Sequence, residues 1–158
     1  MLGDFYALAI IAIACGVLFY VAFADLQNYK IRNEMVLLLA ALYFIYVFAT
    51  GTWNAVPSHL GMAALIFVVM LFCYSYRMLG GGDVKLLTVA FLWVGKDCAL
   101  MFAVVMLSIT GVHAGLVYIG VLGGQTINGR TRIAYAPAIA GALVVVFASG
   151  CLMHPWFM

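Results

Sequence analysis

Long apolar runs alternate with short polar segments along the whole chain. A transmembrane helix needs about 20 mostly apolar residues, so this pattern predicts a series of membrane-spanning helices. The fourth run differs, because it is bounded by Lys85 and Lys96 and would form only about 15 Å of helix. The apolar runs are Phe5–Ala24, Met35 to about Trp53, Leu60–Tyr76, Leu86–Gly95, Cys98 to about Leu122, and Ala134–Met153.

The basic residues favour six spans with both termini on the outer side of the membrane. In that arrangement only Lys96 lies outside, whereas a re-entrant fourth segment would put Arg130 and Arg132 outside and leave the other five basic residues inside. Positive charges concentrate on the cytoplasmic side of membrane proteins, so the six-span arrangement is preferred. The basic residues that it places in the cytoplasm are Lys30, Arg32, Arg77, Lys85, Arg130 and Arg132.

The composition supports the same class of protein. Hydrophobic residues make up 68% of the 158 residues and charged residues only 8%, against about 25% charged residues in soluble domains. We therefore expect an all-α, polytopic membrane bundle of about six helices, with residues 1–158 forming a single domain. The net charge of +2 is too small to suggest a nucleic-acid partner. No basic residue precedes Phe5, so the first run is expected to be a retained helix rather than a cleaved signal.

The four cysteines are scattered, with no CxxC pair and no histidine at metal-ligand spacing. We expect buried thiols rather than a zinc site, and no metal or cofactor. The cysteines are Cys15, Cys73, Cys98 and Cys151.

Two acids, Asp25 and Asp83, are the candidates for chemistry. Asp25 ends the first apolar run, where a carboxylate opposes the helix dipole, and Asp83 follows three glycines in "RMLGGGDVKLL". Both lie on the expected cytoplasmic side at a depth where charge is costly, which makes them functional candidates. The structural alternatives are that Asp83 is a helix N-cap and that Asp25 pairs with Lys30 or Arg32.

Taken together, the two acids fit an aspartyl protease. Two adjacent carboxyl groups share one proton, so one can activate water while the other protonates the scissile carbonyl. The glycines Gly80 to Gly82 would permit close backbone approach. The phosphate-loop, dinucleotide-loop and nucleophile-elbow patterns are all absent from this stretch.

The motif Gly80-Gly81-Gly82-Asp83 matches the GxGD motif of membrane aspartyl proteases. Over essentially its full length the chain resembles the type IV prepilin leader peptidases, in the short form that serves Flp-type (tight-adherence) pili. "DVKL" after the glycines, Asp25, and "IAYAPAIAGA" at positions 133–142 carry the resemblance.

The resemblance implies that Asp25 and Asp83 are the catalytic pair, supported by Gly80, Gly82 and Lys85, with no metal or cofactor. Lys85 either tunes Asp83 or extends to the membrane surface. The implied substrate is a membrane-inserted prepilin, whose short basic leader is removed at the cytoplasmic face of the bacterial inner membrane. The resemblance does not identify the substrate-binding residues.

The chain departs from the family pattern in three respects. Arg32 stands where the family often has proline in Ile-Pro-Asn, and Ala134 and Ala136 stand where proline and glycine are common. The larger relatives carry a cysteine-rich insertion and N-methylate the mature pilin. This chain lacks the insertion, so no methyltransferase activity is expected.

Two other functions remain open on the sequence. A transporter or channel subunit could use Asp25 and Asp83 as an ion or proton site, although only one glycine-rich break is present where transporters tend to have two. A GxGD protease that cuts within a transmembrane helix would be expected to hold both acids deeper.

Two further features concern helix packing. The GxxxG pairs Gly111/Gly115 and Gly120/Gly124 would permit a homo-oligomer. His113 is either a proton relay or a hydrogen-bonding partner of a neighbouring helix.

Overall fold

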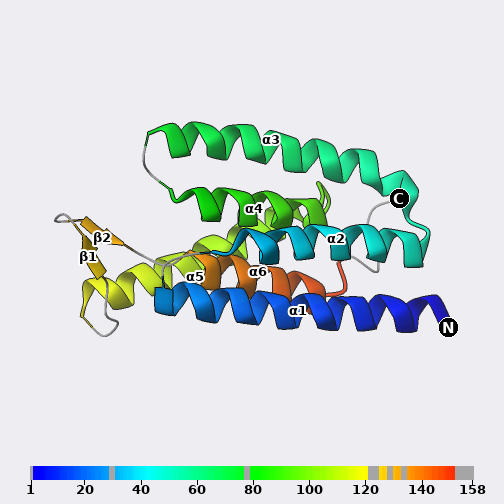
Figure 1. The fold of residues 1–158 in the computed structure, drawn as a ribbon, viewed down its shortest axis with the longest axis horizontal. Coiled ribbons are helices and arrows are strands. Elements are labelled where there is room, and N and C mark those ends of the chain that lie inside the picture. The colour runs from blue at the N-terminus through cyan, green and yellow to red at the C-terminus, as the bar shows by residue number, and fades with distance from the viewer. Residues whose placement is uncertain are drawn as a thin grey trace.

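The computed structural model describes residues 2–28, 31–76, 79–120, 125–127, 130–132 and 135–151. The expected helical bundle is confirmed, with six α-helices in these described residues (Figure 1). A short antiparallel hairpin, in which Gln125 pairs with Arg132, lies between α5 and α6, where a polar loop was expected. The elements are α1 (Leu2–Asn28), α2 (Asn33–Thr50), the 3₁₀ turn η1 (Trp53–Ala55), α3 (Val56–Ser75), α4 (Gly81–Val94), α5 (Ala99–Tyr118), β1 (Gln125–Ile127), β2 (Arg130–Arg132) and α6 (Ala136–Ala148).

Four of the helices, α1, α2, α3 and α5, are long and apolar enough to cross a membrane. The other two are shorter, with 14 residues in α4 and 13 in α6, or about 20 Å of helix each. The start of α4 at Gly81 is earlier than the sequence pattern indicated. Asp83 and Lys85 therefore belong to the first turns of α4 and precede its uncharged stretch.

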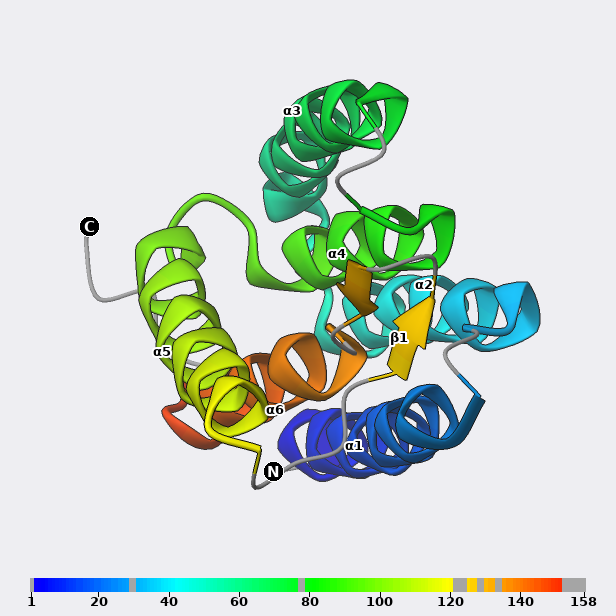
Figure 2. The same cartoon turned by 90° about the vertical axis from the view of Figure 1, so that its left-hand side faces the viewer.

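The two short helices occupy the centre of the bundle. Viewed along the helices, α4 and α6 lie between α1, α2, α3 and α5 (Figure 2). Trp93 of α4 is fully buried, and its indole nitrogen Nε1 donates a hydrogen bond to the Leu39 carbonyl of α2 at 3.0 Å. Because protein rather than lipid surrounds most of α4 and α6, the bilayer thickness does not dictate their length.

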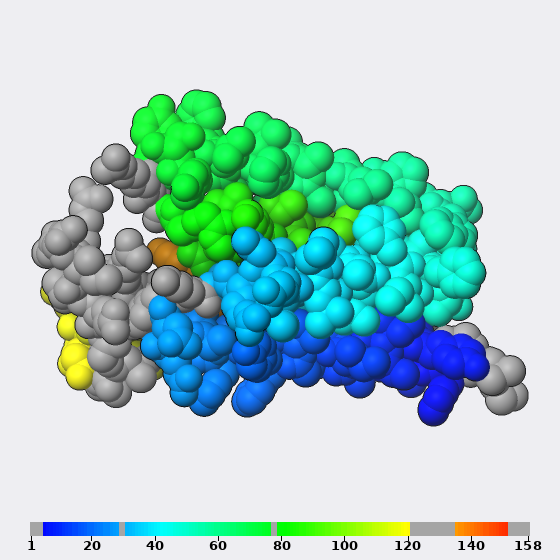
Figure 3. All heavy atoms as spheres, in the orientation of Figure 1, coloured from blue at the N-terminus to red at the C-terminus, as the bar shows by residue number. Residues whose placement is uncertain are grey.

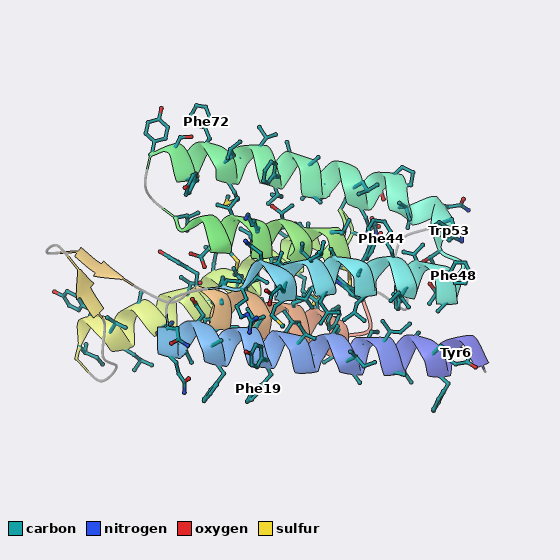
Figure 4. The ribbon with its side chains drawn as sticks, in the orientation of Figure 1. Tyr6, Phe19, Phe44, Phe48, Trp53 and Phe72 are labelled. Atoms are coloured by element: carbon teal, nitrogen blue, oxygen red, sulfur yellow. A yellow bond between two sulfur atoms is a disulfide. The ribbon has the colours of Figure 1, made fainter. Side chains whose placement is uncertain are left out.

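The outer surface is strongly apolar. Phe19, Phe48 and Phe72 are 77%, 77% and 66% exposed, and they project outward from three different helices (Figure 4). Large exposed patches of this kind are incompatible with water on all sides, so the chain is a multi-pass membrane protein. Trp53 lies beyond the end of α2, in the turn η1, a position that suits an interfacial aromatic residue.

The two ends of the bundle differ in what they contain. We call one the hairpin end, because β1 and β2 lie there with the last turn of α1 and the first turns of α4 and α6 (Figure 1). The opposite end holds the start of α1, the connection between α4 and α5, and Cys151 at the end of α6.

Cys98 and Cys151 form a disulfide, with a Cα–Cα distance of 6.3 Å across 53 positions of sequence. The expectation of four thiols is therefore wrong for this pair, whereas Cys15 and Cys73 are free. Cys98 precedes α5 and Cys151 follows α6, and these two packed helices run in opposite directions. We call this end of the bundle the disulfide end.

Cys98→Ser should lower the stability of the purified protein by up to about 4 kcal/mol, because a disulfide that closes a loop this long restricts the unfolded chain. Thermal unfolding in detergent measures the effect, and Cys73→Ser, which removes a free thiol, is the control. Four reactive thiols in the unreduced, denatured wild type would contradict the assignment.

Candidate active site

Asp25 lies in the last turn of α1 and is only 5% exposed. Its Oδ2 accepts a hydrogen bond of 3.2 Å from the backbone N–H of Ala136. Ala136 is the first residue of α6, and its N–H is one of the four that a helix start leaves without an intrahelical partner. The carboxylate that opposes the dipole of α1 therefore lies at the positive end of the dipole of α6.

Asp83 lies in the first turn of α4, and the N-cap position is taken by Gly80. The interpretation of Asp83 as the N-cap residue of α4 is therefore wrong. The side chain turns back toward Gly80, where an added Cβ would lie 2.9 Å from Oδ2 of Asp83. Only glycine leaves room for this conformation of the carboxyl group.

The structure brings the two predicted acids together. Burial is the main cause that raises the pKa of Asp83 to about 6, and the negative charge of Asp25 contributes in the same direction. A hydrogen bond from the backbone N–H of Gly80 lowers the pKa of Asp83 and offsets part of this effect. Up to about pH 6, the pair can thus hold one charged and one neutral carboxyl group, which is the state that acid–base catalysis requires.

The alternative ion pair of Asp25 is not seen among the described residues. Arg32 pairs with Glu34 on the exposed start of α2, and Lys30 lies outside the described residues.

The glycines before Asp83 serve close packing. A Cβ on Gly82 would lie 3.0 Å from Cβ of Ile31, in the connection between α1 and α2. One on Gly81 would lie 3.5 Å from the ring of Tyr74 on α3. None of the three glycines has a positive φ, so the first turn of α4 needs small residues rather than unusual backbone angles.

Lys85 is directed away from Asp83. Its Nζ donates a hydrogen bond to Oδ1 of Asn33 at the start of α2, at 3.0 Å. Two residues along a helix correspond to a rotation of about 200°, so Asp83 and Lys85 occupy opposite faces of α4. The position of Lys85 gives no support to a role in tuning Asp83.

Ala136 is the site residue that sequence reasoning missed. Its contribution is a backbone N–H, which no side chain reveals. The available signal was Pro137, since proline is common in the first turn of a helix and thus marks the start of α6.

Comparison with known proteins identifies the family. The model of the type IV leader peptidase family matches residues 12–120, a range that includes Asp25, the three glycines and Asp83. No curated protein and no solved structure matches the chain. Since the family model covers more than half of the sequence, this membrane protein belongs to the type IV leader peptidase family, whose members are peptidases.

Proposed function

We propose that the protein is a membrane aspartyl endopeptidase that removes the short basic leader of Flp-type prepilins. Asp25 and Asp83 form its catalytic pair. The observation that carries the proposal is that α1 and α4 bring these two carboxyl groups close enough for the charge of Asp25 to raise the pKa of Asp83. Both residues lie in the segment that matches the peptidase family.

The surroundings of the two acids suggest different roles. The N–H of Ala136 and the dipole of α6 favour the charged form of Asp25, so Asp25 takes a proton from the attacking water. The water oxygen bonds to the scissile carbonyl carbon while Asp83 gives its proton to the carbonyl oxygen. The resulting diol returns a proton to Asp83 as the C–N bond breaks, and Asp25 passes its proton to the leaving amine.

The disulfide supports a cytoplasmic active site. Disulfides persist in the periplasm and are rare in the bacterial cytoplasm, so the disulfide between Cys98 and Cys151 favours an orientation with the disulfide end outside. Asp25 and Asp83 lie toward the other end of the bundle and would face the cytoplasm of a cell whose inner membrane holds the protein. The distribution of basic residues favours the same orientation, with both termini outside.

The depth of the acids favours leader removal over cleavage within a transmembrane helix. Asp25 lies in the last turn of α1 rather than near its middle. A peptide bond just outside the apolar helix of a substrate would reach this depth. An ion-transport role gains no support from the family match.

The GxxxG face of α5 is a candidate contact for a second copy of the chain. Gly111 and Gly115 are exposed, and a Cβ on either would meet no atom within 4 Å. Such surfaces allow helices to approach closely in membranes. Gly124 of the other GxxxG pair lies outside the described residues, and His113 is a half-buried residue on α5.

Co-expression with an Flp-type prepilin tests the proposed function. Leader removal would be seen as a gel shift and located by mass spectrometry of the mature N-terminus. Unprocessed prepilin in the presence of well-inserted wild-type enzyme would overturn the proposal.

The cleavage rate should fall as the pH rises through about 6. The pKa of Asp83 is raised to about this value, so its proton is present at lower pH and is lost above it. The initial rates of purified enzyme on a detergent-solubilised prepilin, measured from pH 5 to 8, would show this limb. A rate that stays constant over this range would contradict the role of Asp83 as the acid.

Gly82→Val should reduce cleavage about tenfold or more while the protein still inserts. The branched side chain would collide with Ile31 and displace the first turn of α4, and overpacking of this kind costs about 1–3 kcal/mol. Gly61→Val on α3 is the matched control, because a Cβ there meets nothing within 4 Å. Equal rates for the two variants would show that close packing at Gly82 does not position Asp83.

A further inference from the structure

A lateral groove runs between α2 and α3 on the outside of the bundle. Its volume is about 460 Å³, and its lining includes Val36 and Ala40 of α2, Phe67 of α3, and Val89 of α4. Helix α4 packs against both α2 and α3 and forms the floor, and its atoms are visible between the surfaces of the other two helices (Figure 3). The groove opens on the surface that faces lipid.

One end of this groove lies close to the proposed catalytic pair. Lys85 and Asn33, joined by their hydrogen bond, line it at the hairpin end. Lys85 is two residues from Asp83 on α4 but on the opposite face of that helix. The first turn between these faces consists of Gly81, Gly82 and the N-cap Gly80. Tyr74 and Ile31 pack against Gly81 and Gly82, whereas Gly80 is exposed. A chain that left the groove could therefore cross the start of α4 over Gly80, which has no side chain, and reach the two acids.

We propose that this groove seats the apolar helix of the substrate, the part that follows the scissile bond. This inference rests on the proposed function. The helix would enter sideways from the bilayer and insert several apolar side chains between α2 and α3, as helices do in hydrophobic grooves. A volume of 460 Å³ is within the range of protein binding sites and accommodates side chains rather than a whole helix.

The charge at the groove supports this choice of segment. Lys85 is exposed at the hairpin end, and its positive charge would repel the basic leader. The leader is therefore directed away from the groove, and the uncharged apolar helix is accepted. The scissile bond then lies between the leader and the apolar helix, where the prepilin crosses the start of α4.

Site-specific photo-crosslinking provides a direct test. A benzophenone amino acid at Ala40, in the Asp83→Asn background that should retain uncleaved substrate, is expected to crosslink to the prepilin. The same group at Leu107, an exposed mid-helix residue of α5, should not. Equal crosslinking from both positions, or adducts with phospholipid alone at Ala40, would overturn the assignment.

Kinetics give an independent test in an otherwise wild-type enzyme. Ala40→Trp would fill the groove and should raise KM about tenfold or more with little change in kcat, whereas Leu107→Trp should change neither. If wild-type enzyme cleaves the prepilin but Ala40→Trp leaves KM unchanged, the groove assignment fails and the proposed function stands. If wild-type enzyme does not cleave, the proposed function fails and this assignment with it.

Discussion

Asp25→Asn and Asp83→Asn should each lower the rate of leader cleavage about a thousandfold or more. Asparagine keeps nearly the shape of aspartate but cannot exchange the proton that the pair must share. The double variant should be no slower than either single one, because residues that act as a unit have non-additive effects. Rates come from single-turnover cleavage of a detergent-solubilised prepilin.

Asp97→Asn is the matched control, since Asp97 is an exposed acid in the connection between α4 and α5. All three single variants should insert and purify normally, because the loss of a charge near hydrocarbon costs a membrane fold little. Substantial cleavage by purified Asp25→Asn enzyme would refute the two-aspartate mechanism. It would leave Asp25 with the structural role of capping α6.

The fold class could be predicted because the thickness of the bilayer sets the length of the apolar runs. The basic residues in the loops indicate which side of the membrane each loop lies on. The lengths of α4 and α6 could not be predicted as reliably. Both helices are enclosed by their neighbours, so the bilayer does not fix where they begin or end. The early start of α4 at Gly81 has a direct consequence, because helical rotation then separates Lys85 from Asp83 and directs it toward Asn33.

The two acids could be found because buried charge in a membrane protein is costly and rarely placed without a function. Their surroundings were less visible in the sequence. The N–H of Ala136 lies 111 positions after Asp25, and a backbone donor has no side-chain signature. The disulfide was missed for a similar reason, since the spacing of Cys98 and Cys151 matches no short motif and only the packing of α5 and α6 brings them together.

Ala136→Pro should lower the cleavage rate about ten- to a hundredfold. Proline is accepted at the first position of a helix, and it removes the N–H that donates to Asp25. It also disfavours the αR conformation of Tyr135, the residue before it. A hydrogen bond to a charged group contributes about 1.5–3 kcal/mol, which corresponds to this range of rates. Ala136→Gly keeps the donor and is the matched control.

The pH profile separates a positioning role of this amide from a purely structural one. If the N–H of Ala136 favours the charged form of Asp25, its removal makes the active, singly protonated pair harder to form at low pH. The acidic limb of the cleavage profile should then move to higher pH in Ala136→Pro, whereas Ala136→Gly should follow the wild type. A uniform loss of rate at every pH would mean that proline only disturbs the packing of α6 against α1. An unchanged rate would mean that Asp25 does not need the hydrogen bond that the structure gives it.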